Sequence, residues 1–255
     1  EYKSINVFTK ELNDLLSSAK NAEKSDKSGG TGGGIRSTIS ATDGGSRKSA
    51  VSPIDSIFNV QKADSENSVE TNISNFDDLE GYEWAAEAIN YLKSLNIITG
   101  IGNNKFAPER AVSREEFAKM LVLAFELDEK SETRFEDVSP EAWYYNYISV
   151  CAGCKIIEGI SETKFGTGME ITREEAAVML CRVAKYRNIP LLDGNESKFA
   201  DSEQISDWAL PAVLAAEKNG IFVGNEYNCF MPKKTLTRAQ AAQIICFVMQ
   251  YEKGE

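Results

Sequence analysis

Three arginines stand where a cation is unusual. Arg114, Arg173 and Arg238 each follow a Ser or Thr in the pattern S/T-R-x-E/Q, which predicts the start of a helix with a capping box. The helix dipole favours an anion at this position, so a cation costs about 0.3–1 kcal/mol. A guanidinium beside free backbone N–H groups would receive a carboxylate or phosphate. The alternative is an arginine that is salt-bridged to an Asp of a neighbouring unit.

Three further sets of residues recur in step with the arginines. They are Trp84, Trp143 and Trp208; Asp78, Asp137 and Asp201; and Gly100, Gly159 and Gly224. Each tryptophan could stack on a sugar ring or anchor a helix start in the core. Each aspartate could cap a helix or accept sugar hydroxyls. The glycines lie in loops and could supply backbone donors, so all twelve residues are candidates for ligand binding.

These residues belong to an internal repeat that fills the C-terminal two thirds of the chain. Arg173 follows Arg114 by 59 residues and Arg238 follows Arg173 by 65, and the longer spacing fits extra linker residues at 188–198. Long periods of this kind predict repeated units that bury one another's apolar faces. Apolar residues at helical spacing predict a helix, a loop and a second helix in each unit, and therefore an all-α fold. The predicted units are 76–134, 135–198 and 199–255.

The residues before the repeats differ in composition. Residues 1–28 carry apolar side chains at helical spacing and predict an amphipathic helix, either the tail of an upstream domain or a partner-binding helix. Residues 29–75 are rich in Gly and Ser and predict a flexible linker. Because the first residue is Glu1 and not Met, we expect a processed chain or a fragment.

Composition excludes several functions. The 255 residues carry a net charge of -11, which argues against nucleic acid as a partner. The sequence has no histidine, so it lacks Ser-His-Asp and Cys-His nucleophile pairs and every His-ligated metal site. No apolar run is long enough to cross a membrane. No pair of carboxylates stands apart from the repeat as a glycosidase would need. We therefore predict no enzyme activity, no cofactor and no membrane insertion.

The cysteines are interpreted through the repeat. Cys151 and Cys154 form a C-x-x-C, which could be a redox pair or half a zinc site. The repeat instead places them, with Cys181 and Cys246, mostly at core positions, where a free Cys packs as a small hydrophobe. Cys229 is expected to be exposed in a loop. We therefore predict no metal site.

The order F-x-D, W, G, F-x-P and [ST]-R-x-[EQ], present three times over residues 76–251, resembles the S-layer homology (SLH) domain family. The resemblance implies a pseudo-threefold helical spindle. It also implies anchoring of a surface protein to secondary cell-wall polysaccharide, with pyruvylated sugars bound in grooves between the units. In this family the repeated Arg contacts the acidic sugar, and Arg114, Arg173 and Arg238 fall on that position. The implied location is extracellular, in the cell wall or S-layer.

This sequence departs from the family pattern at several positions. Glu115 and Glu174 replace Ala, Gln240 replaces Glu, and the second unit has F-G-T-G from Phe165 in place of F-x-P. The added carboxylates either weaken an anionic ligand or complement the helix dipole. Two other functions stay open at this point. One is a helical-repeat protein scaffold, and the other is the tail of a surface enzyme whose catalytic domain lies upstream.

Overall fold

A computed structural model describes residues 76–252, in which each repeat is a helix, a loop and a second helix. The elements are α3 (Glu83–Ser94), α4 (Arg114–Ala124), α5 (Tyr145–Gly153), α6 (Arg173–Tyr186), the 3-10 turn η2 (Ser202–Gln204), α7 (Leu210–Lys218) and α8 (Arg238–Glu252). Between residues 76 and 252 there is no β-strand, only isolated bridges. The all-α prediction is confirmed. The helix predicted in 1–28 and the linker predicted in 29–75 lie outside the described residues.

The second helix of each repeat begins where its capping box predicts. Ser113 Oγ accepts from the N–H of Glu116, and Glu116 Oε2 accepts from the N–H of Ser113. Thr172 and Glu175 make the same pair of bonds. In the third repeat the corresponding bonds join Thr237 and Gln240. Each box satisfies two N–H groups that a helix start leaves unpaired.

The first helices begin less regularly. Trp84 lies inside α3, whereas Trp143 and Trp208 precede α5 and α7. Turns occupy the preceding residues, with bonds such as Ala142 N–H to Ser139 C=O and Ala209 N–H to Ser206 C=O. Trp143 and Trp208 therefore lie before, and not within, the first helices of their repeats.

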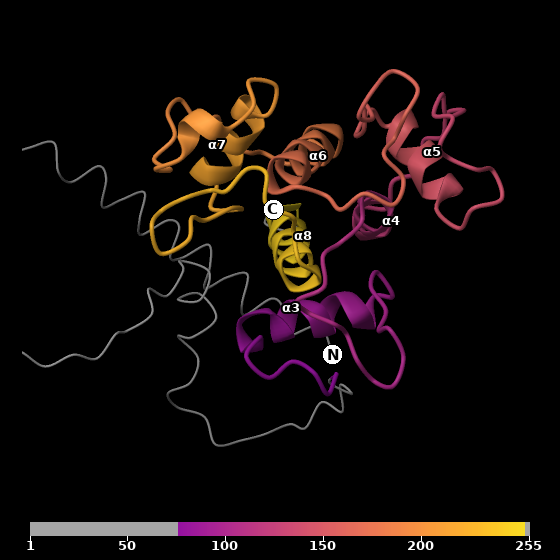
Figure 1. Cartoon of the computed structure of the whole chain (residues 1–255), viewed down its shortest axis with the longest axis horizontal. Helices are drawn as coiled ribbons and strands as arrows, with labels where there is room; N and C mark the ends of the chain where they lie inside the picture. Colours follow the sequence, from indigo (N-terminus) through magenta and orange to yellow (C-terminus); the bar gives the residue numbers. More distant parts are fainter. Residues whose placement is uncertain (1–75, 253–255) are drawn as a thin grey trace, which may run out of the picture. The chain divides into compact units, whose positions relative to one another are not determined.

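The repeats are packed in a closed cycle. Helices α4, α6 and α8 contact one another in the middle, and α3, α5 and α7 lie around them (Figure 1). Helix α5 packs on α4 and α7 packs on α6, whereas α3 packs on α8. The first helix of each repeat thus packs on the second helix of the preceding repeat, and the first repeat packs on the last. No repeat buries its own two helices against each other as its principal contact.

Backbone hydrogen bonds close the same cycle at the centre. The N–H of Arg114 donates to Met169, that of Arg173 to Lys234 and that of Arg238 to Arg110, each at 2.9 Å. A second set of backbone bonds, also of 2.9 Å, runs from the N–H of Ile171 to the C=O of Val112, from the N–H of Leu236 to the C=O of Ile171 and from the N–H of Val112 to the C=O of Leu236. These residues directly precede or begin the three central helices. The ring therefore fixes the starts of α4, α6 and α8 relative to one another.

Side chains from every repeat contribute to one apolar core. The largest fully buried ones include the loop phenylalanines Phe106, Phe165 and Phe230. The extra residues of the longer spacing form a loop after α6, as predicted, and the side chain of Asn219 hydrogen-bonds both the N–H and the C=O of Leu192 there. Across residues 76–252, every helix is too short or too polar to span a bilayer.

Candidate functional site

The repeated arginines are buried between repeats. Arg114, Arg173 and Arg238 are 5%, 7% and 9% exposed. Each Nε donates to the carbonyl of the loop phenylalanine of the next repeat, at 2.9, 2.6 and 2.8 Å, and each guanidinium lies over that phenylalanine ring. The third arginine reaches back to the first repeat. The arginines are therefore part of the contacts that close the cycle.

The second contact of each guanidinium differs between repeats. Nη2 of Arg173 donates to the C=O of Val223 at 3.0 Å, and Nη2 of Arg238 donates to the C=O of Thr99 at 2.7 Å. Arg114 instead donates from Nη1 to Glu175 Oε1 at 2.5 Å. The alternative of a salt bridge to a neighbouring unit is thus confirmed for this one arginine, with Glu in place of Asp.

Burial lowers the pKa values of two of these arginines. Desolvation lowers the pKa of Arg173 to about 10, against a smaller opposing effect of Asp201. Desolvation also lowers the pKa of Arg238, with repulsion from Arg110 acting in the same direction. A pKa near 10 leaves the Arg173 guanidinium charged at neutral pH. Its remaining nitrogen, Nη1, donates to no residue of the described part of the chain.

The expectation of free N–H groups at the helix starts was wrong for α6 and α8, where the first three N–H groups all have acceptors. The N–H of each arginine is taken by the central ring. The next N–H is also used in two repeats, because Glu174 donates to Pro232 C=O and Ala239 donates to Pro108 C=O. The capping boxes use the N–H after that. A ligand would therefore meet the guanidinium and not the helix dipole.

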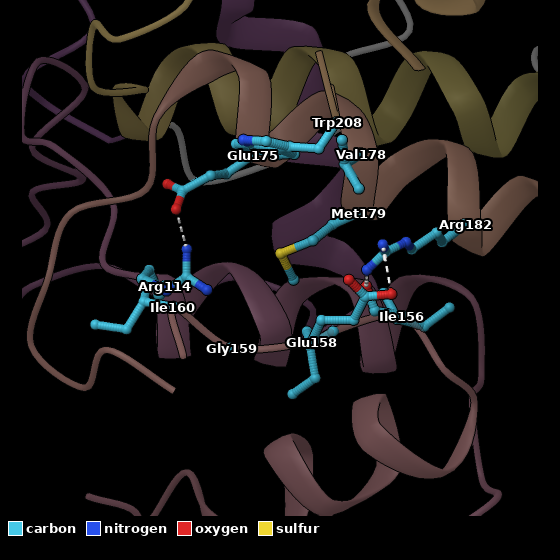
Figure 2. A pocket seen from close by; sticks show the side chains of 11 residues that line it. Arg114, Ile156, Glu158, Gly159, Ile160, Glu175, Val178, Met179, Arg182 and Trp208 are labelled. Atoms are coloured by element: carbon cyan, nitrogen blue, oxygen red, sulfur yellow. Dashed lines mark hydrogen bonds and ion pairs between the residues drawn. The ribbon is translucent and has the colours of Figure 1, made fainter. Parts of the chain in front are cut away.

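A cavity of about 400 Å³ lies beside Arg114, and we name it groove A (Figure 2). It brings together Arg114 of the first repeat, Gly159 of the second and Trp208 of the third. Its lining includes two ion pairs, Arg114 with Glu175 at 2.5 Å and Arg182 with Glu158 at 2.9 Å. Both cations of groove A are thus paired with carboxylates inside the protein.

A second cavity, of about 190 Å³, lies beside Arg173, and we name it groove B. It combines Arg173 of the second repeat, Gly224 of the third and Trp84 of the first. Among the described residues that line it, the other polar side chains are uncharged and include Gln240 and Gln243. The sequence interpretation missed these two glutamines as site residues. The sequence signal that could have identified Gln243 is its polar side chain at a repeat position where the second repeat has Val178.

The remaining set is Arg238, Gly100 and Trp143. Arg238 contacts the carbonyl of Thr99, next to Gly100. Trp143 lies against α4, where Lys119 Nζ is 5.7 Å from the centre of its ring. Glu116, the capping-box residue of α4, pairs with Arg110 at 2.5 Å. Each predicted Arg, Gly and Trp therefore has neighbours from other repeats, in the same cyclic order.

The tryptophans lie at the surface. Trp84, Trp143 and Trp208 are 36%, 55% and 58% exposed. The alternative of a core anchor at the helix start is therefore wrong for the second and third and weak for the first. An exposed indole beside a cavity presents an apolar face of the kind that packs on the C–H face of a sugar ring.

The aspartates hold the loops that carry the phenylalanines. Asp78 accepts from the N–H groups of Phe106 and Ala107, both at 2.8 Å. Asp137 and Asp201 bind the equivalent loop amides of their own repeats. Helix capping is therefore the wrong reading of these residues. A role with sugar hydroxyls stays a prediction, and it would compete with bonds that both carboxylate oxygens already make.

These loop bonds also set the acidity of the aspartates. Burial would raise the pKa of Asp78, but the N–H donors of Phe106 and Ala107 outweigh it and hold the pKa below its ordinary value. The same balance, with donors from Phe165, Thr167 and Gly166, lowers the pKa of Asp137. Both carboxylates are therefore ionised at neutral pH.

The glycines are required by packing as well as by the cavities. A Cβ on Gly100 would lie 2.6 Å from Lys105 C=O and 2.6 Å from the Phe76 ring. A Cβ on Gly159 would meet Lys164 C=O and the Phe135 ring at 2.5 Å. Gly224 is similarly close to the backbone of Asn228. At Gly100 and Gly159 the missing side chain lets the loop pass over an aromatic ring, and at Gly224 it lets the loop approach the backbone of Asn228.

The departures from the repeat pattern have structural partners. Glu174 is buried and accepts from Ser206 N–H at 3.1 Å and from Lys233 Nζ at 2.5 Å. It therefore fixes the turn that carries Trp208. Glu115 accepts from Gly168 N–H at 3.2 Å. Both carboxylates bond to neighbouring loops, so they act mainly in joining repeats.

The unusual loop of the second repeat keeps the conformation of the others. Gly166 has φ +89°, and Ala107 and Met231 have φ 59° and 56° at the same position. Thr167 replaces the proline and adds a bond from Oγ1 to Asp137 C=O at 2.9 Å.

The C-x-x-C cysteines occupy core positions, as the repeat predicted. Cys151 and Cys154 are buried, and Cys246 is buried as well. Desolvation raises the pKa of Cys151 well above its ordinary value and raises that of Cys181 to about 12. Cys229 lies in a loop but is only partly exposed. In the described part of the chain, no three side chains of metal-ligating type gather around a common point.

Comparison with known proteins agrees with this architecture. The family model "S-layer homology domain" matches residues 75–118, 134–177 and 198–242. The Surface-layer 125 kDa protein of Lysinibacillus sphaericus is 33% identical over 156 residues, 61% of this chain and 13% of that protein. The amylopullulanase of Thermoanaerobacterium thermosulfurigenes is 34% identical over 175 residues, 67% of this chain and 9% of that protein. Exoglucanase XynX of Acetivibrio thermocellus is 33% identical over 175 residues, which are 67% of this chain and 16% of that protein.

The three matched segments cover more than half of the chain, which therefore belongs to the SLH domain family. The chain spans only 9–16% of the length of these three relatives. The similarity to the enzymes is confined to the SLH region. With S-layer proteins among the relatives, the family locates the chain at the bacterial cell surface, in the cell wall or S-layer, where it serves in anchoring.

Proposed function

We propose that residues 76–252 bind an acidic secondary cell-wall polysaccharide, with pyruvylated sugars as the charged groups, in the grooves between the repeats. One observation carries the proposal: grooves A and B each gather a buried Arg, a loop Gly and an exposed Trp from three different repeats. Arg supplies charge and directed donors for a carboxylate. Trp supplies an apolar face for the sugar ring.

The experiment is binding to purified cell-wall sacculi, before and after extraction of the secondary polymer. The parent should bind only the unextracted sacculi. Replacing Trp84, Trp143 and Trp208 together by Ala should reduce that binding at least tenfold, about 1.4 kcal/mol. These side chains are exposed, so the variant should keep its fold.

The matched control is Leu192→Ala, since Leu192 is 55% exposed and lines neither groove. It should bind like the parent. Equal binding by the parent to extracted and unextracted sacculi would contradict the polysaccharide proposal. Full binding by a folded triple Trp variant would contradict the placement of the site.

We further propose that this chain is the anchoring tail of a larger surface protein, with an effector domain upstream. The relatives that this chain matches over a small fraction of their length are named as a surface-layer protein, an amylopullulanase and an exoglucanase. The described residues offer no carboxylate pair distinct from the repeat, so the effector would lie outside them. Mass spectrometry of the intact protein released from cell walls would measure the length of the mature chain.

A further inference from the structure

The end of the first helix is covered in the second and third repeats but exposed in the first. Leu95, Cys154 and Asn219 are the C-cap residues of α3, α5 and α7, and each stands eleven residues after the repeated tryptophan. Cys154 and Asn219 are 5% and 7% exposed, whereas Leu95 is 45% exposed. One repeat position is therefore buried twice and presents an apolar side chain at the surface once.

In the second repeat, the cover is the chain segment that leads into the repeat. Cys154 Sγ donates to Glu129 C=O at 3.7 Å, and the N–H of Ser131 donates to the C=O of Ser149, in α5, at 3.2 Å. A Cβ on Gly153 would lie 2.3 Å from the carbonyl oxygen of Glu129. The incoming segment thus passes directly over the end of α5.

The third repeat uses its incoming segment in the same way. The side chain of Asn219 accepts from the N–H of Leu192 at 3.0 Å and donates to the C=O of Leu192 at 2.8 Å. The N–H of Lys198 donates to Glu217 Oε1, in α7, at 2.9 Å. The incoming segment is therefore bonded along the last turns of α7.

The chain before the first repeat carries the same entry signal. Thr133 and Ser197 stand two residues before the first Phe of their repeats, and each hydroxyl accepts from the N–H of that Phe, at 3.2 and 3.1 Å. Ser74 stands at the same position before Phe76. Phe76 is buried, and Lys93 Nζ, in the last turn of α3, lies 4.0 Å from the centre of its ring. The chain therefore joins the described fold beside the end of α3.

The spacing identifies which residues would provide the cover. Glu129 and Leu192 stand six and seven residues before the first Phe of their repeats, and the same count in the first repeat gives Glu70 and Val69. Ile73 is a second apolar residue of this stretch. Removing apolar side chains from water on an exposed leucine is favourable.

We infer that residues 69–75 dock on the last turn of α3 and cover Leu95, as the incoming segments of the other two repeats cover α5 and α7. The occupant of this surface is thus a segment of the same chain. The anchoring unit then begins at residue 69, and the predicted linker ends at 68. A pull from the upstream part of the chain would reach the first repeat through this docked segment. The inference goes beyond the proposed function and does not depend on it.

Hydrogen exchange of the full chain, read by peptide mass spectrometry, tests the docking. After correction for intrinsic rates, residues 69–75 should exchange at least tenfold more slowly than residues 30–50. Leu95→Lys should raise the rates in 69–75 at least fivefold and leave those of α8 unchanged. This variant should fold, because Leu95 is exposed and a cation is favourable at a helix C-terminus.

The matched control is Ile101→Lys, since Ile101 is 55% exposed and lies in the loop after α3. It should leave the exchange of 69–75 as in the parent. Equal exchange of 69–75 and 30–50 in the parent, or protection that survives Leu95→Lys, would overturn the inference. Protection that increases with protein concentration would assign the surface to a second copy of the chain instead.

A cross-link tests the same contact independently of exchange rates. Glu70→Cys combined with Leu95→Cys, in a Cys229→Ser background, should form a disulfide under oxidised glutathione, as peptide mass spectrometry would show. Ser40→Cys combined with Leu95→Cys should form one at least tenfold more slowly, because Ser40 belongs to the Gly-rich stretch. Equal rates for the two pairs would contradict the docking, whatever the result of the polysaccharide experiments.

Discussion

Arg238 joins the last repeat to the first, so its removal should open the cycle. Its Nε and Nη2 donate to Phe106 C=O at 2.8 Å and Thr99 C=O at 2.7 Å, and its guanidinium lies 4.3 Å from the centre of the Phe106 ring. Arg238→Ala leaves two carbonyls without these donors. An unsatisfied buried group costs about 1–3 kcal/mol, and the lost cation–π contact adds about 0.5–2 kcal/mol.

The desolvation of the guanidinium in the parent offsets part of this loss. We therefore expect Arg238→Ala to lower the free energy of unfolding by about 2–5 kcal/mol, a large share of the ~5–15 kcal/mol of an ordinary domain. Urea unfolding of the full chain, followed by far-UV circular dichroism, would measure it. Hydrogen exchange should show the loss of protection in α3, because α3 packs on α8.

The control is Arg110→Ala. Arg110 has a side chain that is 44% exposed and pairs with Glu116 at 2.5 Å, and exposed pairs contribute about 0–1 kcal/mol. Arg238→Lys should fall between the two variants, since Lys keeps the charge but not the fork that reaches two carbonyls. A loss below 1 kcal/mol for Arg238→Ala, or one equal to that of Arg110→Ala, would refute the closing role of this arginine.

Four further outcomes follow from the contacts. Gly100→Ala should destabilise the domain by about 1–3 kcal/mol in urea unfolding, because its Cβ would overlap Lys105 C=O and the Phe76 ring. Folding lowers the pKa of Asp78, so the ionised carboxylate stabilises the folded domain fully above its ordinary pKa of 3.8, and this stabilisation is lost as the pH falls through the lower pKa of the folded state. Asp78→Asn should therefore flatten the dependence of the free energy of unfolding on pH in this range. Iodoacetamide should modify Cys229 before the buried Cys151 in the native protein, as peptide mass spectrometry would show. Residues 76–134 alone should show no cooperative thermal transition, because α3 lacks α8.

The helices and their starting residues could be predicted from sequence because their signals are local and repeated. A capping box is four residues long, and its chemistry is complete within one turn, so Ser113, Thr172 and Thr237 were identified correctly. The three-unit period likewise needs only a comparison of the sequence with itself. These features depend little on the rest of the fold.

The partners across repeats could not be predicted in the same way. Apolar periodicity identifies which face of α3 is buried, but it does not say that the face meets α8. Glu116 and Glu175 are the same residue type at the same repeat position, yet one pairs with Arg110 and the other with Arg114. Glu116 pairs with an arginine six residues earlier in its own repeat, whereas Glu175 pairs with an arginine of the preceding repeat.

The cyclic packing connects ligand binding to the integrity of the domain. Groove B is formed by Arg173, Gly224 and Trp84, which come from the second, third and first repeats and converge only when the cycle is closed. A ligand that contacts all three therefore binds the closed state and not the open one. By linkage, a ligand at 100 times its dissociation constant would add about 2.7 kcal/mol to the stability of the closed domain. That gain is comparable to the loss expected for opening the cycle at Arg238, so binding of the proposed polymer would also stabilise the domain against unfolding under an applied force.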